Sequence, residues 1–336
     1  MRYHFLGSCG VQVSELCLGA MMFGGATPEA ESISIIHHAI DDGINFIDTA
    51  NIYAKGESER IVGKAIRDRR DRVVLATKVK VAVGEGPNDS GSSRFHILRE
   101  VDNSLRRLGV DHIDLYYLHQ YDRHTPLEES LRTLDDLVRQ GKVRYIGCSN
   151  FYAYQVCEGL WIADRRGLER FSCIQPLYNM VNRDPEVELF PMCQVHGVGV
   201  VVYSPLARGV LTGKYRAGEK LPEGSRAARG DTRIQQTELR EDSFRVAQEL
   251  ARLAEQKGVP LSQLAFAWVL ANPLVTSAII GPRTMEQYED YVKALACKIS
   301  AEDEAFVDRL VPPGEHTGWG FNDPSYPVRG RPVAKG

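Results

Sequence analysis

Four polar residues of complementary chemistry stand at or just after the ends of short apolar runs: Asp48, Tyr53, Lys78 and His119. Asp48 closes the run 45–48, Lys78 closes 73–78 and His119 closes 113–119, while Tyr53 lies in the loop that follows Asp48. If these runs are consecutive parallel strands, their carboxyl ends meet at one mouth of a barrel. A carboxylate, a phenol, an ammonium and an imidazole at that mouth are suited to handing a proton to a carbonyl oxygen.

Each of these groups has a part in such a proton transfer. A tyrosine hydroxyl has an ordinary pKa of about 10, which makes it a weak acid without help. The ammonium of Lys78 would stabilise the phenolate and lower that pKa, and the carboxylate of Asp48 would hold the ammonium in place. The imidazole of His119 can donate a hydrogen bond to the carbonyl. Taken singly, each residue is more often a cap, a packing residue or a solvated strand end, but the complementary set on three consecutive strands favours catalysis.

The runs belong to a regular alternation of strand-like and helix-like stretches. The predicted strands are short, continuous and β-branched, which is typical of strands buried on both faces, and they lie at 16–19, 45–48, 73–77, 113–119, 143–148, 173–175, 198–203 and 277–280. Helical periodicity is found at 31–42, 57–66, 95–108, 127–140, 152–165, 187–196, 243–256, 261–270 and 285–294. This alternation predicts an α/β fold, a (β/α)8 TIM barrel, with an N-terminal β-hairpin cap over 3–13. An open doubly wound sheet is the alternative, disfavoured because no G-x-G-x-x-G follows any strand.

Two segments break the alternation. Residues 214–242 are polar, rich in Gly and Arg, and without periodicity, which is typical of a functional loop. The tail after Leu310 has too many Pro and Gly residues for a helix, but it carries aromatic side chains that need an apolar surface. We therefore expect a single barrel domain over 1–336, with its core at about 3–310 and an irregular tail at 311–336.

The composition limits the classes of function. The chain has 336 residues, of which 43% are hydrophobic and 25% are charged, so it can bury a large core. The net charge of −3 and the lack of a basic stripe argue against nucleic-acid binding, and no apolar run is long enough to span a membrane. Seven cysteines without C-x-x-C spacing and an N-terminus without an apolar leader indicate a reduced, cytoplasmic protein. The segment 119–124 lacks the ligand spacing of a zinc site, so we expect no metal.

With these residues in place, the sequence resembles the aldo-keto reductase superfamily over about residues 3–310. Besides Tyr53 and Gly56, the motifs that carry the resemblance lie at 18–24, 46–50, 76–79, 105–108, 116–119, 146–151, 174–179, 203–206 and 280–283. The resemblance implies a barrel closed by an N-terminal hairpin and an NADPH-dependent reduction of an aldehyde or ketone to the alcohol. It also implies that the four polar residues above are the catalytic tetrad, with Tyr53 as the general acid.

The resemblance assigns cofactor contacts as well. Tyr203 would lie against the nicotinamide, and Ser149, Asn150 and Gln175 would hold its carboxamide. The segment 204–214 would grip the pyrophosphate, and the start of the last barrel helix would meet the adenosine phosphate. The full set implied for the cofactor is Gly19, Met21, Ser149, Asn150, Gln175, Tyr203, Ser204, Leu206, Gly209, Leu211, Lys214, Gly281, Arg283, Gln287 and Asp290.

Two positions depart from the family's pattern, because Tyr291 stands where members often have Asn, and Arg208 stands at a more variable position. The residues expected at the substrate are Phe23, Tyr53, His119 and Trp319, with further pocket walls from 82–93, 120–125 and 312–330. Two other functions stay open: a cofactor-sensing, weakly catalytic binding subunit that resembles potassium-channel β subunits, and a metal-dependent barrel hydrolase. The sequence specifies neither the carbonyl substrate nor the oligomeric state.

Overall fold

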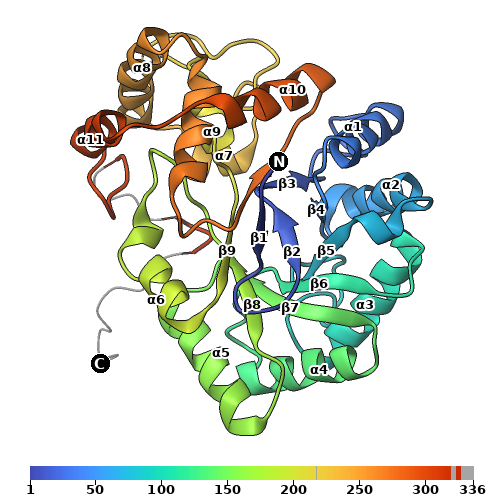
Figure 1. Cartoon of the computed structure of the whole chain (residues 1–336). Coiled ribbons are helices and arrows are strands. Elements are labelled where there is room, and N and C mark those ends of the chain that lie inside the picture. The colour runs from blue at the N-terminus through green and yellow to red at the C-terminus, as the bar shows by residue number, and fades with distance from the viewer. Residues whose placement is uncertain (217, 319–322, 327–336) are drawn as a thin grey trace.

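Eight short strands close into a parallel barrel in the order β10-β3-β4-β5-β6-β7-β8-β9 (Figure 1). This computed structural model describes residues 1–216, 218–318 and 323–326. The barrel strands are β3 (Leu16–Gly19), β4 (Phe46–Asp48), β5 (Val74–Val79), β6 (Ile113–Leu118), β7 (Val143–Ser149), β8 (Phe171–Gln175), β9 (Gly199–Val202) and β10 (Ser277–Ile280). Every predicted barrel strand is present, so the (β/α)8 barrel is confirmed and the open doubly wound sheet is wrong.

The strands direct side chains alternately into the barrel and toward the helices, because the side-chain period of a strand is two. An apolar cluster fills the barrel interior near the amino ends of the strands, and its buried members are Leu6, Val13, Cys17, Phe46, Ala76, Leu115, Tyr117, Cys173 and Val201. Five members of this cluster are each followed, two positions further along the chain, by a residue of the expected site. The residues at these positions are Gly19, Asp48, Lys78, Gln175 and Tyr203. The same alternation therefore places these five residues inside the carboxyl mouth, directly above the apolar cluster.

Helices surround the barrel and cover the outer faces of its strands (Figure 1). The helices of the described residues are α1 (Glu29–Asp41), α2 (Glu57–Ile66), α3 (Arg94–Leu108), α4 (Leu127–Arg139), α5 (Ala153–Arg166), α6 (Leu189–His196), α7 (Thr232–Gln236), α8 (Glu241–Gln256), α9 (Leu261–Ala271), α10 (Met285–Lys293) and α11 (Ala301–Leu310). Short 3-10 turns lie at η1 (Tyr53–Gly56), η2 (Arg70–Arg72), η3 (Asp184–Glu186), η4 (Ala207–Thr212) and η5 (Ala294–Ala296). All predicted helices are present, and α7 and α11 are additional to them. A sequence signal for α11 exists, because Ser300 and Asp303 form a capping box at its start.

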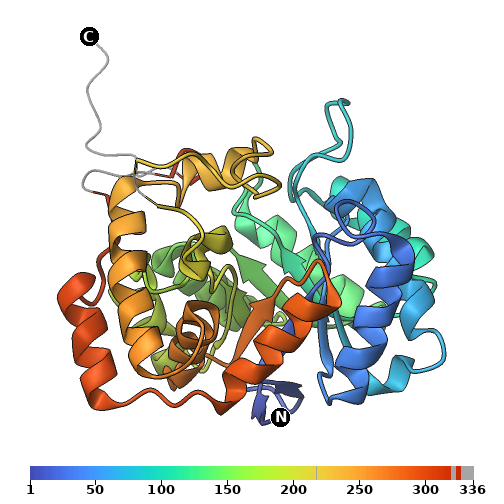
Figure 2. The same cartoon turned by 90° about the horizontal axis from the view of Figure 1, so that it is seen from above.

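An N-terminal hairpin closes the amino end of the barrel. β1 (Tyr3–Phe5) pairs antiparallel with β2 (Gln12–Ser14), and the adjoining Leu6 is fully buried in the apolar cluster. Gly7 in the turn has a φ of +62°, and a Cβ at this position would lie 2.4 Å from the carbonyl oxygen of Ser172, so the close approach requires glycine. Figure 2 shows the hairpin at one end of the barrel and the segment after β9 at the opposite end. The predicted hairpin cap is confirmed.

The segment 214–242 and the C-terminal tail meet at the carboxyl end of the barrel. Apart from the short helix α7 and the first two residues of α8, the described part of this segment is irregular, as expected from its lack of periodicity. Arg233 on α7 forms a two-pronged ion pair with Asp323, with N–O distances of 2.9 and 2.7 Å, and donates to the hydroxyl of Ser325 at 2.7 Å. These bonds attach residues 323–326 of the tail to the edge of the barrel mouth.

Candidate active site

A cavity of about 660 Å³ opens at the carboxyl ends of the barrel strands. Its lining comes from strand ends, from η4 and the segment after it, from the start of α10 and from the tail. The expected site residues that line it are Gly19, Met21, Asp48, Tyr53, His119, Ser149, Asn150, Gln175, Tyr203, Ser204, Leu206, Gly209, Lys214, Gly281, Arg283, Gln287 and Asp290. The fold thus brings residues from almost the whole length of the chain into one site.

The four residues of the expected tetrad lie close together at this cavity. Lys78 is fully buried, and its ammonium donates hydrogen bonds to the Asp48 carboxylate and to the carbonyl oxygen of Thr49, the latter at 2.8 Å. The hydroxyl of Tyr53 lies 3.4 Å from Lys78 Nζ. The ring of His119 meets the ring of Tyr53 edge-on, with their centroids 5.9 Å apart. Tyr53 therefore has both an ammonium and an imidazole as direct neighbours.

Burial and charge set the protonation states of these groups. Burial raises the pKa of Tyr53 above its ordinary value, and the nearby ammonium of Lys78 offsets this only in part. Burial acts to lower the pKa of Lys78, but the Asp48 carboxylate and Tyr53 outweigh it and raise that pKa. Burial, followed by the charges of Lys78 and Lys80, lowers the pKa of His119 well below its ordinary value. At neutral pH the site therefore holds a protonated tyrosine, an ammonium and a neutral imidazole.

Polar groups from β7, β8 and the end of β9 form one wall beside the tetrad. Gln175 Nε2 donates to Asp48 Oδ2 at 2.9 Å, and Ser149 Oγ donates to the carbonyl oxygen of Gln175 at 2.8 Å. Asn150 has a φ of +58°, donates to the carbonyl oxygen of His119 at 3.1 Å, and accepts from the hydroxyl of Tyr203 at 2.8 Å. Hydroxyl, amide and aromatic groups are thereby fixed in position beside the tetrad.

Another part of the cavity wall is strongly cationic. Its basic residues are Arg208, Lys214, Arg226, Arg229, Arg233 and Arg283. Burial lowers the pKa of Lys214, and the charges of Arg283, Arg229 and Arg226 lower it further, which shows how closely these cations are gathered. A bound anion relieves such repulsion and accepts charge-assisted hydrogen bonds, so this region is suited to phosphate groups.

Four of these arginines were not among the expected site residues: Arg208 lies in η4, and the other three lie further along the chain. Arg226, Arg229 and Arg233 belong to the segment 214–242, where the sequence is visibly rich in arginine but has no period that would orient any one of them. Arg226 pairs with Asp231 at 2.9 Å, which holds its guanidinium in place. Their arrival at the cavity depends on the path of an irregular loop.

Two expected site residues do not line the cavity, and a third lies outside the described residues. The side chain of Phe23 is fully buried in the hydrophobic core and does not line the cavity, because the chain turns back at the Phe23–Thr27 bridge, and Met21 and Met22 line the cavity instead. Leu211 is likewise fully buried in the core and does not line the cavity. Trp319 lies outside the described residues.

The expected pocket walls are found in part. Gln120 lines the cavity and donates to the hydroxyl of Tyr326 at 3.0 Å, so the 120–125 loop and the tail meet there. Tyr152 fixes Tyr326 further by donating to its carbonyl oxygen at 3.0 Å. The loop 82–93 does not line the cavity, but Val81, just before this loop, does. Ile52 also lines it, directly before Tyr53 in the chain.

Within residues 1–216, 218–318 and 323–326, no group of three or more His, Cys, Asp or Glu side chains could hold a metal ion. No helix in this part of the chain is both long and apolar enough to cross a membrane. All seven cysteines are free thiols.

The fold and the site together define a (β/α)8 barrel whose chemistry-bearing residues gather at the carboxyl ends of its strands, the usual location of active sites in this fold. The sequence model of the Aldo/keto reductase family matches residues 15–312. The chain therefore belongs to the Aldo/keto reductase family. That family comprises oxidoreductases that in general act on small carbonyl compounds with nicotinamide cofactors.

Named relatives cover nearly the whole chain. The uncharacterized oxidoreductase YrpG of Bacillus subtilis (strain 168) is 40% identical over 329 residues, covering 94% of this chain and 98% of that protein. A probable voltage-gated potassium channel subunit beta of Arabidopsis thaliana is 40% identical over 301 residues, covering 88% and 91%. The L-glyceraldehyde 3-phosphate reductase of Escherichia coli O157:H7 is 33% identical over 334 residues, covering 95% of both chains.

Proposed function

We propose that this chain reduces an aldehyde or ketone to the alcohol with NADPH, and that Tyr53 is the general acid. One observation carries the proposal: the Tyr53 hydroxyl lies 3.4 Å from the buried ammonium of Lys78 and next to His119, in a cavity that also has a cationic wall. The tetrad supplies the chemistry of a proton donor, and the cationic wall supplies the chemistry of a phosphate site.

The groups along the cavity fit a phosphorylated nicotinamide dinucleotide. Ser149, Asn150 and Gln175 offer hydroxyl and amide groups for a carboxamide, and the ring of Tyr203 offers a flat face for the nicotinamide. The cations gathered around Lys214 fit the pyrophosphate and an additional phosphate. When bound, this cofactor would supply the hydride that the carbonyl carbon receives.

The tetrad residues would then share the work on the carbonyl oxygen. The Tyr53 hydroxyl donates its proton to that oxygen as negative charge develops on it. The ammonium of Lys78 stabilises the phenolate that remains, and Asp48 holds the ammonium through their hydrogen bond. His119 is neutral because of its lowered pKa, so its single N–H can donate a hydrogen bond to the same oxygen.

The protonation states predict a flat pH profile for reduction. The general acid must be protonated, and the pKa of Tyr53 is raised, so the acid form is lost only above the ordinary tyrosine value of about 10. The lowered pKa of His119 keeps its imidazole neutral down to acidic pH. We expect kcat for reduction, measured with saturating NADPH, to change little between about pH 6 and pH 9. A steep fall in kcat within that range would contradict the assigned states.

Arg283 is expected to select NADPH over NADH. Its guanidinium lines the cavity at the start of α10 and contributes to the charge around Lys214. Loss of one charge-assisted hydrogen bond to the 2′-phosphate costs roughly 1.5–3 kcal/mol. The variant Arg283→Ala should therefore bind NADPH roughly tenfold to a hundredfold more weakly, as measured by fluorescence titration, with little change for NADH.

Lys214→Met is the matched control for this prediction. Lys214 lines the cavity, and we expect it to contact the pyrophosphate, which both cofactors contain, so its loss should weaken NADPH and NADH binding alike. If Arg283→Ala also weakens both cofactors equally, Arg283 does not recognise the 2′-phosphate.

The tail segment 323–326 is expected to influence substrate choice. Tyr326 lines the cavity, held by Gln120, Tyr152 and the guanidinium of Arg233, which lies 5.6 Å from the centre of its ring. Deleting residues 319–336 should raise KM roughly twofold to tenfold for carbonyls large enough to contact this aromatic wall, while the NADPH dissociation constant barely changes. Deleting only 327–336 keeps Tyr326 and should have no such effect. If both deletion variants keep the wild-type KM for every carbonyl of a panel, the tail does not contact substrate.

A carbonyl panel with NADPH tests the proposed function as a whole. The panel should contain aliphatic and aromatic aldehydes, ketones and a phosphorylated aldehyde, because one relative is named for reducing L-glyceraldehyde 3-phosphate. We expect at least one to consume NADPH in step with alcohol formation. A second candidate is a cofactor-sensing, weakly catalytic binding subunit, favoured by relatives that are named probable potassium channel β subunits. Tight NADPH binding without turnover on the panel would support that alternative, and absence of both binding and turnover would overturn both.

A further inference from the structure

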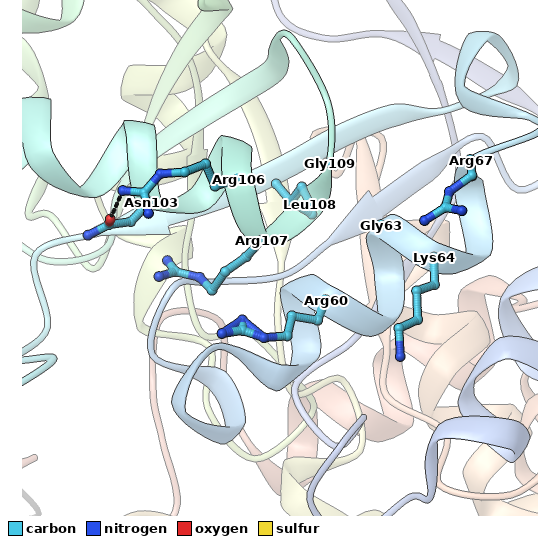
Figure 3. A pocket seen from close by; sticks show the side chains of 9 residues that line it. All are labelled: Arg60, Gly63, Lys64, Arg67, Asn103, Arg106, Arg107, Leu108 and Gly109. Atoms are coloured by element: carbon cyan, nitrogen blue, oxygen red, sulfur yellow. Dashed lines mark hydrogen bonds between the residues drawn. The ribbon is translucent and has the colours of Figure 1, made fainter.

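Arg107 joins the outside of the barrel to its buried interior. It leaves α3 at the groove between α2 and α3, a cavity of about 430 Å³ that is also lined by Arg60, Lys64 and Arg106 (Figure 3). Its Nε donates to Glu59 Oε2 at 2.5 Å. The Glu59 side chain is completely buried, whereas 18% of the Arg107 side chain is exposed. Arg107 therefore supplies positive charge from the rim of the groove to a carboxylate inside the protein.

Glu59 connects this ion pair to the strand that carries Lys78. Its other oxygen, Oε1, accepts a hydrogen bond of 2.6 Å from the hydroxyl of Thr77. Thr77 is completely buried and directly precedes Lys78 in β5. Because successive side chains of a strand point to opposite faces, Glu59 holds β5 from its outer face while Lys78 faces the barrel interior.

A second branch reaches the loop that carries Tyr53. Arg107 Nη2 lies 3.8 Å from Glu100 Oε2, and the same oxygen accepts a hydrogen bond of 2.9 Å from Asn51 Nδ2. Asn51 in turn donates its backbone N–H to the carbonyl oxygen of Lys78 at 3.3 Å. Glu100 and Asn51 are both buried, so these contacts are shielded from water. The loop and the strand of the proton-transfer pair are thus tied to the same guanidinium.

Arg107 also packs directly beneath the turn that presents Tyr53. This turn, η1, contains Ala54 and Lys55 at φ values of +47° and +55°, and it ends at Gly56 with a φ of +92°. A Cβ on Gly56 would lie only 2.8 Å from Arg107 Cδ, so the arginine stem and the turn are in close contact. Non-glycine residues in this backbone region persist only when the surrounding structure holds them there.

We propose that Arg107 is a positioning residue that sets the separation between the Tyr53 hydroxyl and Lys78 Nζ, through Glu59 and Thr77 on one side and Glu100, Asn51 and Gly56 on the other. It touches neither substrate nor cofactor. Without it, two buried carboxylates lose their shared cation and the η1 turn loses its support. The inference rests on the proposed function, because the separation matters for proton transfer from Tyr53.

The test compares Arg107→Met with Arg106→Met, its neighbour on α3. Arg106 lines the same groove, but its hydrogen bond goes to Asn103, a half-buried residue on its own helix, and only the amide of Asn103 reaches Glu100. Replacing Arg106 therefore leaves both buried carboxylates with their contacts to Arg107, and kcat should stay within a small factor of the wild-type value. Arg107→Met should lower kcat for reduction by roughly tenfold to a hundredfold, as expected for a misplacement of about 1 Å, and shift the pH dependence of kcat. The NADPH dissociation constant should stay at its wild-type value. Arg107→Lys keeps a cation that can reach Glu59 and should restore part of the lost rate.

Two further measurements keep the test decisive. Arg107→Met leaves the Glu59 carboxylate unpaired, and the variant could fail to fold for that reason. In that case the double variant Glu59→Gln/Arg107→Met, which removes this charge, is used in the kinetic test instead. Crystal structures should show the distance from the Tyr53 hydroxyl to Lys78 Nζ increased in the Arg107 variants and unchanged in Arg106→Met. A folded Arg107 variant with wild-type kcat, pH profile and Tyr53–Lys78 distance would overturn the inference. If the wild-type protein reduces no carbonyl, the proposed function fails, and the measured distance alone still decides the role of Arg107.

Discussion

Replacing Tyr53 with Phe should lower kcat for carbonyl reduction by roughly 10²–10⁴-fold, the usual contribution of a general acid, with little change in NADPH affinity. The substitution keeps the aromatic ring and removes only the hydroxyl that lies 3.4 Å from Lys78 Nζ. Lys78 keeps its hydrogen bonds to Asp48 and to the carbonyl oxygen of Thr49, so the buried ion pair stays intact. Steady-state kinetics and fluorescence titration with NADPH measure the two quantities separately.

Tyr326→Phe provides a matched control for this prediction. Tyr326 also lines the cavity, but its hydroxyl bonds to Gln120. Loss of that hydroxyl should lower kcat by no more than about tenfold, well below the loss expected for Tyr53→Phe, because a neutral hydrogen bond typically contributes no more than about 1.5 kcal/mol. Near-wild-type turnover by Tyr53→Phe would show that Tyr53 is not the general acid.

The barrel and the meeting of Asp48 with Lys78 could be predicted because both follow from local periodicity. Each barrel strand is a short apolar run, and side chains two positions apart in a strand lie on the same face. Asp48 therefore faces the barrel interior like Phe46, and Lys78 faces it like Ala76. Once the strands are parallel and consecutive, their carboxyl ends must meet. The sequence predicted that Lys78 lowers the pKa of Tyr53 below its ordinary value, whereas this pKa is raised. The Lys78 charge does act to lower this pKa, but burial acts more strongly and raises it.

The resemblance indicated Lys214 and Arg283, but the other four arginines of the cationic wall could not be predicted, because their positions depend on irregular backbone. Arg208 and Gly209 have positive φ, and the turn they form brings Arg208 to the cavity and Leu211 into the core. Arg226 and Arg229 reach the cavity from a segment that has no period at all. Side-chain direction in such segments is set by long-range contacts, and sequence spacing alone carries no information about it.

The network behind the tetrad illustrates the same limit within regular structure. The helices that carry Glu59 and Arg107 were predicted, yet the two residues are 48 positions apart and their pairing depends on how α2 packs on α3. Likewise, Asn51 and Glu100 are 49 positions apart. Helical periodicity identifies the buried face of each helix, but not which polar residue on that face meets which partner.

Replacing Lys78 with Met should abolish most reduction and also destabilise the fold, and the two effects can be separated. Lys78 is fully buried and bonded to Asp48, whose side chain is only 3% exposed. Removing one partner of a buried ion pair typically costs about 3–5 kcal/mol, because the other charge is left unpaired. Thermal unfolding should therefore show a lower Tm for Lys78→Met than for the wild-type protein. The rate should fall at least as far as that of a general-acid variant, roughly 10²-fold or more, since burial then raises the pKa of Tyr53 without an ammonium to oppose it.

The double variant Asp48→Asn/Lys78→Met distinguishes catalysis from stability. The amide introduced by Asp48→Asn carries no charge to leave unpaired, and its oxygen can still accept the hydrogen bond that Gln175 Nε2 donates to Asp48 at 2.9 Å in the wild-type protein. Much of the lost Tm should therefore return, while kcat should stay as low as in Lys78→Met, because the ammonium next to the Tyr53 hydroxyl is still absent. Recovery of kcat together with Tm would show that Lys78 serves only the fold. A low kcat in a protein of restored stability would locate its role in the acidity of Tyr53.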